Sequence, residues 1–184
     1  IAAPHLLTDT DLSSGELRAL LQLASEVKKS PVDYQRALAG YCIALLFEKP
    51  SLRTRMTFQL AIKQLGGDAI FQDHCDDRIG NREPVRDMAR NLSRWIQAVV
   101  VRTFTQKTIE DLARWSSVPV INALSDKFHP CQALADFQTL VERFGELNGL
   151  KMTFVGDGNN VCHSLMLCAS RLGISISRCR HGSH

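Results

Sequence analysis

Apolar runs alternate along the chain with segments in which apolar residues recur at helical spacing. The runs predict buried strands at 41–47, 69–71, 98–102, 118–122, 151–155 and 174–178. The periodic segments predict helices over much of 1–40 and at 52–65, 84–96, 106–116, 130–144 and 161–172. Strands that are apolar throughout are typical of parallel sheets covered on both faces, so we expect an α/β fold with helices flanking a parallel sheet.

A glycine at each end of the segment 145–149 marks a change in this pattern. We therefore expect a first domain at 1–145 and the start of a second, Rossmann-like α/β domain at 146–184. The second segment contains a single strand–helix–strand unit, which is too little sheet to bury both of its faces. We expect it to be incomplete.

Composition excludes several classes of partner. The 184 residues carry a net charge of only +3, dispersed along the chain, which argues against nucleic acid or a membrane surface as a partner. No apolar run has the length of a transmembrane helix. The six cysteines form no C-x-x-C pair and the histidines have no ligand spacing, so we expect reduced thiols, a cytoplasmic location and no zinc site.

The strongest candidate site follows the strand 41–47. Ser51 is a good N-cap for the next helix, which places Leu52, Arg53, Thr54 and Arg55 in its first turn. Free backbone N–H groups and the positive end of the helix dipole favour a phosphate there. The alternative is an ordinary N-cap followed by solvated arginines. Two arginines and two hydroxyls within five residues favour the anion site.

Two further groups follow strands whose carboxyl ends should meet the same edge of the sheet. Arg102 ends the strand 98–102, where a solvated terminus is the alternative. His129 and Gln132 begin the helix after the strand 118–122, where they could converge on one ligand. The alternative is that His129 caps the helix and Gln132 is an exposed helical residue. The set offers no paired carboxylate and no activated nucleophile. It suits binding a phosphorylated compound and polarising its carbonyl group.

Four motifs, in order along the chain, resemble the aspartate/ornithine carbamoyltransferase family, and within it the ornithine-specific branch. They are Phe-Glu-Lys-Pro-Ser-Leu-Arg-Thr-Arg at 47–55, Arg-Thr-Phe at 102–104, Leu-Ser-Asp-Lys-Phe-His-Pro-Cys-Gln at 124–132 and Gly-Asp-Gly-Asn-Asn at 156–160. The resemblance runs from about Leu6 to about Ile174.

The resemblance implies a first domain that binds carbamoyl phosphate. It implies that the phosphate is held by Ser51, Leu52, Arg53, Thr54 and Arg55, and the carbamoyl group by Thr54, Arg102, His129 and Gln132. Of these, the resemblance implies catalytic roles for Arg53, Thr54, Arg102, His129 and Gln132. Asn160 matches a residue that contacts the amino-acid substrate. The implied reaction is attack by the δ-amine of ornithine, giving citrulline and phosphate without metal or cofactor.

The resemblance also implies a homotrimer joined through the first domain. Its polar loop, 72–83, would reach a neighbour's site, with Arg78 and Arg82 where the family usually has glutamine and lysine. Leu52 replaces a threonine of the usual motif, and the same Ser-Leu-Arg-Thr-Arg form occurs in relatives that use N-acylornithine. N-acylornithine, putrescine or aspartate therefore remain alternative acceptors.

The family's later Asp…Ser-Met and His-Cys-Leu-Pro motifs are absent, and the tail 177–184 no longer resembles the family. We therefore expect a fragment or truncated chain. Such a chain could be a carbamoyl-phosphate-binding subunit without turnover.

Overall fold

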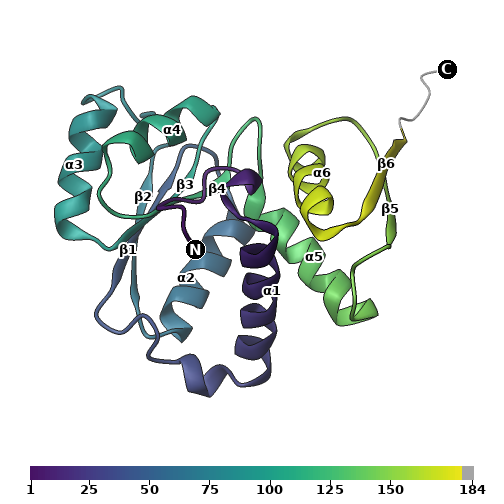
Figure 1. Ribbon diagram of the computed structural model, residues 1–184. Coiled ribbons are helices and arrows are strands. Elements are labelled where there is room, and N and C mark those ends of the chain that lie inside the picture. Colours follow the sequence, from purple (N-terminus) through teal and green to yellow (C-terminus); the bar gives the residue numbers. More distant parts are fainter. Residues whose placement is uncertain (180–184) are drawn as a thin grey trace.

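The computed structural model describes residues 1–179 and contains two parallel sheets with helices packed around them (Figure 1). The strands are β1 (Cys42–Phe47), β2 (Asp68–Asp73), β3 (Ala98–Arg102), β4 (Val120–Leu124), β5 (Lys151–Val155) and β6 (Ser175–Cys179). The α-helices are α1 (Ser14–Lys29), α2 (Leu52–Gln64), α3 (Val85–Trp95), α4 (Gln106–Trp115), α5 (Pro130–Phe144) and α6 (Asn160–Leu172). Short 3-10 turns are η1 (Asp9–Asp11) and η2 (Pro31–Tyr34). The expected α/β class is confirmed.

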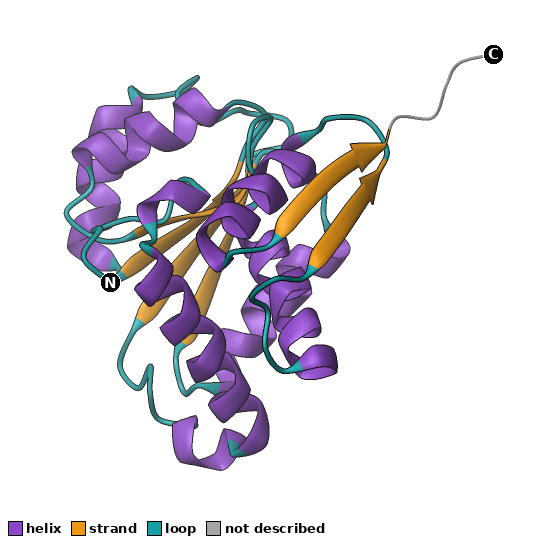
Figure 2. Ribbon diagram, turned by 45° about the vertical axis from the view of Figure 1, so that its right-hand side comes forward, coloured by secondary structure: helices purple, strands orange, loops and turns teal. Residues whose placement is uncertain are grey.

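The larger sheet has the strand order β2-β1-β3-β4, and all its pairs are parallel. Side chains alternate across β1: Ile43, Leu45 and Phe47 join an apolar cluster that includes Ile62 of α2. Ala44 and Leu46 join a second cluster on the opposite face, which α3 and α4 cover. Figure 2 shows helices on both sides of these strands. Covering on both faces explains why β1 and β3 read as continuous apolar runs.

Two predicted segments differ in detail. The predicted strand 118–122 lies two residues later, at Val120–Leu124, because Pro119 has no N–H to donate to the ladder. The predicted helical region 1–40 contains α1 and two short 3-10 turns, whereas residues 35–40 are turns. Its start is partly extended: Leu6 forms a parallel bridge with Ile121, which extends the β4 edge of the sheet.

The smaller sheet pairs β5 with β6 and packs with α6 against α1 and α5 (Figure 1). Leu17, Leu21, Phe137, Ala169 and Leu172 belong to one buried cluster there. This core includes residues from both sides of the predicted boundary at 145, so that division remains a prediction. The final residues of the predicted segment 146–184, namely 180–184, lie outside the described residues, as does the end of the unfamiliar tail.

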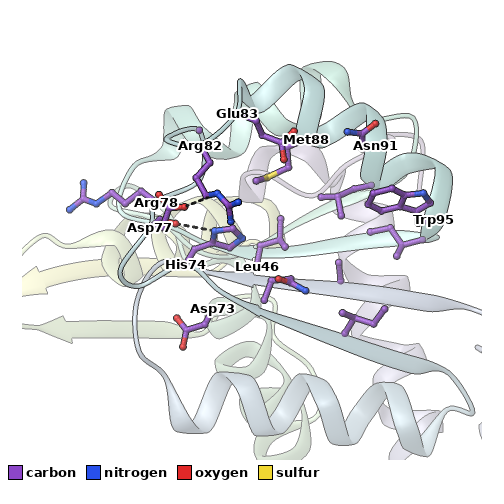
Figure 3. A pocket seen from close by; sticks show the side chains of 16 residues that line it. Leu46, Asp73, His74, Asp77, Arg78, Arg82, Glu83, Met88, Asn91 and Trp95 are labelled. Carbon is purple, nitrogen blue, oxygen red and sulfur yellow. Dashed lines mark hydrogen bonds and ion pairs between the residues drawn. The ribbon is translucent and has the colours of Figure 1, made fainter.

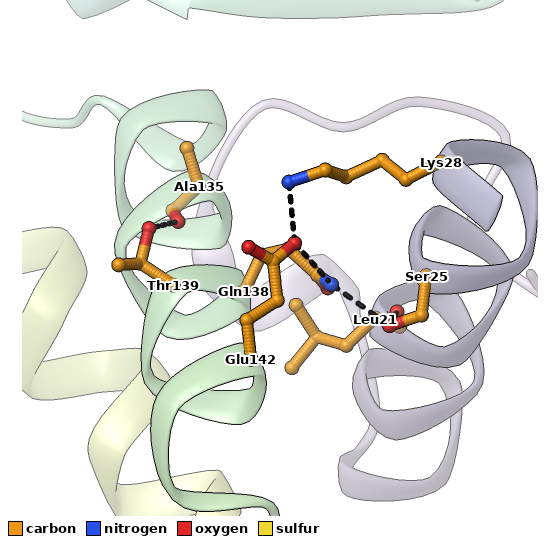
Figure 4. Close-up of polar contacts among 7 residues, drawn as sticks. All are labelled: Leu21, Ser25, Lys28, Ala135, Gln138, Thr139 and Glu142. Carbon is orange, nitrogen blue, oxygen red and sulfur yellow. Dashed lines mark hydrogen bonds and ion pairs between the residues drawn. The ribbon is translucent and has the colours of Figure 1, made fainter.

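Figure 4 shows how α1 and α5 are also joined by polar groups. Lys28 pairs with Glu142 at 2.6 Å, and the Gln138 amide donates to Ser25 Oγ at 2.8 Å. Within residues 1–179, no helix is both long and apolar enough to cross a membrane.

Candidate functional site

The candidate groups lie where three neighbouring strands of the larger sheet end. Phe47 of β1 is opposite Arg102 of β3, and Arg102 is opposite Leu124 of β4. The turn that begins α2, the Arg102 side chain and the segment leading to His129 therefore start from one edge of the sheet. This is the edge at which parallel α/β sheets bind ligands.

Ser51 is the N-cap of α2, as predicted. Its backbone is extended, with φ −159° and ψ 110°, and its Oγ accepts the N–H of Thr54 at 3.3 Å. The first turn of α2 contains no acidic residue. Arg53 is exposed, and its guanidinium forms no ion pair within residues 1–179. The start of α2 thus keeps the positive potential that favours an anion.

The other residues of this turn lie in different surroundings. Leu52 is 79% exposed, so its side chain makes little contact with the fold. Arg55 lies over the Phe71 ring, 3.6 Å from its centroid, and donates from Nε to Gln59. It lines a cavity of about 460 Å³ with Lys49, Ser51, Asp73 and Cys75. Arg55 therefore extends towards β2 along the edge of the turn.

Arg102 and His129 carry buried nitrogen atoms without protein partners. Within residues 1–179, Arg102 Nε and His129 Nδ1 are two of only four buried side-chain polar atoms that lack a hydrogen bond. Buried polar groups are otherwise nearly always paired in folded proteins, so each such atom calls for an explanation. A bound polar ligand at this edge would supply the missing partner.

Burial and the neighbouring Arg102 lower the pKa of His129 to about 4. Burial also lowers the pKa of Arg102. The imidazole is therefore neutral at pH 7, with one ring nitrogen donating and the other accepting. A neutral imidazole beside a guanidinium gives a site with donors but only one positive charge.

Gln132 and Asn160 both have partners within the chain. The Gln132 amide donates to Asp136, one turn along α5, at 2.9 Å. The Asn160 amide donates to the carbonyl oxygen of Ser125 at 2.7 Å, and its Oδ1 accepts the N–H of Val161. Asn160 thus ties α6 to the segment before His129. The predicted contacts of both residues with substrates remain predictions.

Arg78 and Arg82 belong to the polar loop after β2 and line a cavity of about 730 Å³ between the β2 side of the sheet and α3. Figure 3 shows Met88, Asn91 and Trp95 along the wall formed by α3. Arg82 pairs with Asp77 at 3.8 Å, and Arg78 lies over the Phe104 ring at 4.3 Å. Both arginines remain close to the surface, and their role in a neighbour's site remains a prediction.

Glu48 organises this region and was not among the predicted site residues. It is only 3% exposed, and its two carboxylate oxygens accept the backbone N–H groups of Ile79 and Phe104 at 3.1 and 2.9 Å. One carboxylate thus joins the end of β1 to the polar loop and to the segment after Arg102. The signals in the sequence are an acidic residue directly after an apolar strand and its place in the motif at 47–55.

Comparison with known proteins identifies the family of this chain. Residues 4–142 match the family described as "Aspartate/ornithine carbamoyltransferase, carbamoyl-P binding domain". The chain is 49% identical over 173 residues to the ornithine carbamoyltransferase of Shewanella oneidensis, covering 94% of this chain and 58% of that protein. It is also 49% identical over 175 residues to that of Rhodococcus jostii, with 94% and 55% covered.

Solved structures give the same result. The ornithine carbamoyltransferase of Thermus thermophilus superposes with a TM-score of 0.92 at 47% identity, covering 98% of this chain and 62% of that one. The enzyme of Pyrococcus furiosus gives a TM-score of 0.93 at 41% identity, with 97% and 58% covered. The chain spans about 60% of the length of the relatives it matches. It belongs to the aspartate/ornithine carbamoyltransferase family.

Proposed function

We propose that this chain carries the carbamoyl-phosphate site of an ornithine carbamoyltransferase. The observation that carries the proposal is the pair of buried, unpartnered nitrogens of Arg102 and His129 beside the start of α2. Carbamoyl phosphate has the matching chemistry: a phosphate for the helix start and a carbonyl oxygen for the two nitrogens.

In the proposed reaction the neutral δ-amine of ornithine attacks the carbamoyl carbon. A carbon–nitrogen bond forms, the carbon–oxygen bond to phosphate breaks, and the amine loses a proton as citrulline and phosphate are produced. Ser51, the N–H of Leu52, Arg53 and Thr54 would hold the phosphate, with Arg55 in support. Negative charge on the leaving phosphate would be stabilised by this fixed set of donors.

Arg102, His129 and Thr54 would polarise the carbamoyl oxygen, and Gln132 would hold the carbamoyl amine. Arg102 supplies positive charge where negative charge develops on oxygen, and the neutral His129 can donate a hydrogen bond. The amide oxygen of Gln132 would accept an N–H of the carbamoyl amine, while its amide nitrogen keeps the bond to Asp136.

Ornithine is the proposed acceptor because the relatives that match over most of the chain bear that name. Asn160 would contact it through the second N–H of its amide, because the first donates to the Ser125 carbonyl. N-acylornithine, putrescine and aspartate are the alternatives. The division at residue 145 and a cytoplasmic location belong to the same proposal.

We further propose assembly into a homotrimer through the β2 side of the larger sheet. Leu52, Met56 and Leu60 recur every four residues on α2 and are 79%, 46% and 49% exposed. Across the open edge strand β2, Ile70 is 48% exposed and Trp95 of α3 is 70% exposed. Exposed apolar groups gathered on one side of a fold are typical of an interface. Copies meeting there could bring Arg78 or Arg82 to a neighbour's site.

Calorimetric titration of carbamoyl phosphate into the purified chain tests the proposed function. We expect saturable binding, with inorganic phosphate binding more weakly because it lacks the carbamoyl group. Product analysis with ornithine, N-acetylornithine, putrescine and aspartate then identifies the acceptor. Binding without any product would support a carbamoyl-phosphate-binding subunit. No binding by a folded chain would refute the proposal.

A further inference from the structure

A buried carboxylate, that of Asp9 on η1, is connected to His129 through one serine. The backbone N–H of His129 donates to Ser164 Oγ at 2.9 Å, and this hydroxyl donates to Asp9 Oδ2 at 2.5 Å. Asp9 and Ser164 are 1% and 0% exposed. The three residues come from η1, α6 and the N-cap of α5, so this chain of bonds joins three separate parts of the fold.

The arrangement leaves Ser164 no alternative direction for its proton. Its Oγ accepts from His129, which directs the single O–H towards Asp9. The second carboxylate oxygen of Asp9 accepts the thiol of Cys168, also on α6, at 3.3 Å. The carboxyl group is therefore held on both sides by α6 and cannot turn without breaking a bond.

The beginning of α6 holds the rest of the same loop as well. Asn160 donates to the carbonyl oxygen of Ser125 at 2.7 Å, and the His163 ring contacts the carbonyl oxygen of Lys127 at 3.0 Å. Together with Ser164, these contacts fix the segment 125–129 at three points. The His129 side chain has no such support, because its Nδ1 has no partner. Its position is set through the backbone.

We infer that Asp9 and Ser164 are positioning residues, which hold the backbone at His129 so that its imidazole stays buried beside Arg102. The effect on catalysis rests on the proposed function, because there a misplaced His129 could not donate to the carbamoyl oxygen. Neither residue touches that site directly. Supporting residues must hold a catalytic side chain within about 0.5 Å of its productive position.

The charged and titratable groups around this chain of bonds are few. Asp11 on η1, Cys168 on α6 and Cys131 on α5 interact with Asp9. Arg171 on α6 interacts with Cys168, and Arg102 interacts with His129. Burial raises the pKa of Asp9, and its hydrogen bonds from Ser164 and Cys168 act in the opposite direction. Removing a carboxylate from water costs free energy, and the hydrogen bonds from Ser164 and Cys168 offset part of that cost.

The test follows the His129 ring by NMR through a pH titration, with the signal assigned by its loss in His129→Gln. In Ser164→Ala we expect the pKa of His129 to rise by about one unit from its value of about 4, because the released loop admits water. Hydrogen exchange of the His129 amide should be at least about tenfold faster.

Asp9→Asn separates position from charge. Removing a negative charge alone would lower the pKa of a nearby imidazole, whereas loss of position raises it. We expect a rise; a fall would reduce Asp9 to an electrostatic neighbour and overturn its part of the inference. The matched control is Arg18→Gln, which removes a bond to the carbonyl oxygen of Leu172 at the end of α6 but none to η1 or to His129.

Arg18→Gln should lower thermal stability as the two variants do, while leaving the pKa of His129 unchanged. An equal pKa rise in all three would mean general loosening of α6 and would overturn the inference. If a variant does not fold, the unaltered chain still decides, because rapid exchange of the His129 amide there would contradict the bond to Ser164. Carbamoyl phosphate binding is measured separately. Its absence would refute the proposed function without bearing on whether Asp9 and Ser164 position His129.

Discussion

The Arg102 guanidinium lies near enough to the His129 imidazole to disfavour its protonation, and both side chains are partly buried at the end of the larger sheet. Burial is the larger cause of the low pKa of His129, and Arg102 the smaller. We therefore expect Arg102→Met to raise the pKa of His129 but to leave it below 6.5. NMR titration measures this directly, and a pKa at or above 6.5 would contradict the assigned order of causes.

Protonation of His129 should also make stability depend on pH. The folded protein binds this proton only near pH 4, whereas the unfolded chain binds it near 6.5, so acid favours unfolding as the pH falls through this window. Urea unfolding at several pH values should show a smaller loss in His129→Gln. The raised pKa of Asp9 acts in the opposite direction, and Glu16, with a pKa of about 2, adds its loss only below about pH 4.5.

Replacing Arg53 tests the phosphate site. A charge-assisted hydrogen bond contributes about 1.5–3 kcal/mol, so Arg53→Ala should weaken carbamoyl phosphate binding at least about tenfold. Where turnover is measurable, we expect a loss of at least about a hundredfold. Arg94→Ala, which removes an exposed arginine from the last turn of α3, is the control and should bind normally. Near-normal binding by Arg53→Ala would remove Arg53 from the site.

Substitution of the buried Glu48 should lower the free energy of unfolding more than the same substitution at the exposed Glu83. Glu48→Gln keeps one acceptor oxygen where two backbone N–H groups require partners, which costs about 1–3 kcal/mol of unfolding free energy. Glu83→Gln, an exposed change in the same loop, should cost little. Equal denaturation midpoints for the two variants would show that water replaces the Glu48 oxygen.

The proposed interface on α2 can be tested by charge. Met56→Glu together with Leu60→Glu should dissociate the trimer, because two carboxylates would be buried without partners. Sedimentation velocity should then show monomers. Leu23→Glu introduces a charge at a comparably exposed position on α1 and should leave the mass unchanged. A chain that is monomeric before any substitution would refute the proposed assembly.

The ion pair between α1 and α5 should matter less than its 2.6 Å length suggests. The Lys28 and Glu142 side chains are 63% and 42% exposed, so water screens their attraction. Lys28→Ala should cost less than about 1 kcal/mol in urea unfolding. Gln138 is only 8% exposed, and its truncation to alanine should cost more because it also removes packed volume and the bond to Ser25.

Patterns local in sequence predicted most of the fold. The apolar run at β3, the N-cap Ser51 and the capping box between Ser13 and Glu16 each depend on neighbours a few residues away. The predicted strand 69–71 was too short, because Gln72 and Asp73 are polar and join β2 only through pairing with β1. The bridge from Leu6 to Ile121 could not be foreseen for the same reason.

In the candidate site too, local patterns locate some residues, whereas the roles of others depend on distant partners. Ser51, Arg102 and His129 end strands or begin helices, which sequence patterns locate well. The roles of Glu48 and Asp9 depend on partners 31 to 159 positions away, and no pattern near either residue identifies those partners. Arg55 was placed with the phosphate group by the motif, whereas its contact with Phe71 depends on how β2 lies beside α2.

The carboxylate of Glu48 also has a consequence for the order of folding. Its two partners are 31 and 56 positions away in the sequence, so each bond closes a long loop, and the bond to Phe104 also requires β1 and β3 to lie side by side. These bonds should be absent from the transition state. Weakening them should then accelerate unfolding while leaving the folding rate nearly unchanged. Glu48 would therefore slow the unfolding of the native protein without speeding its folding.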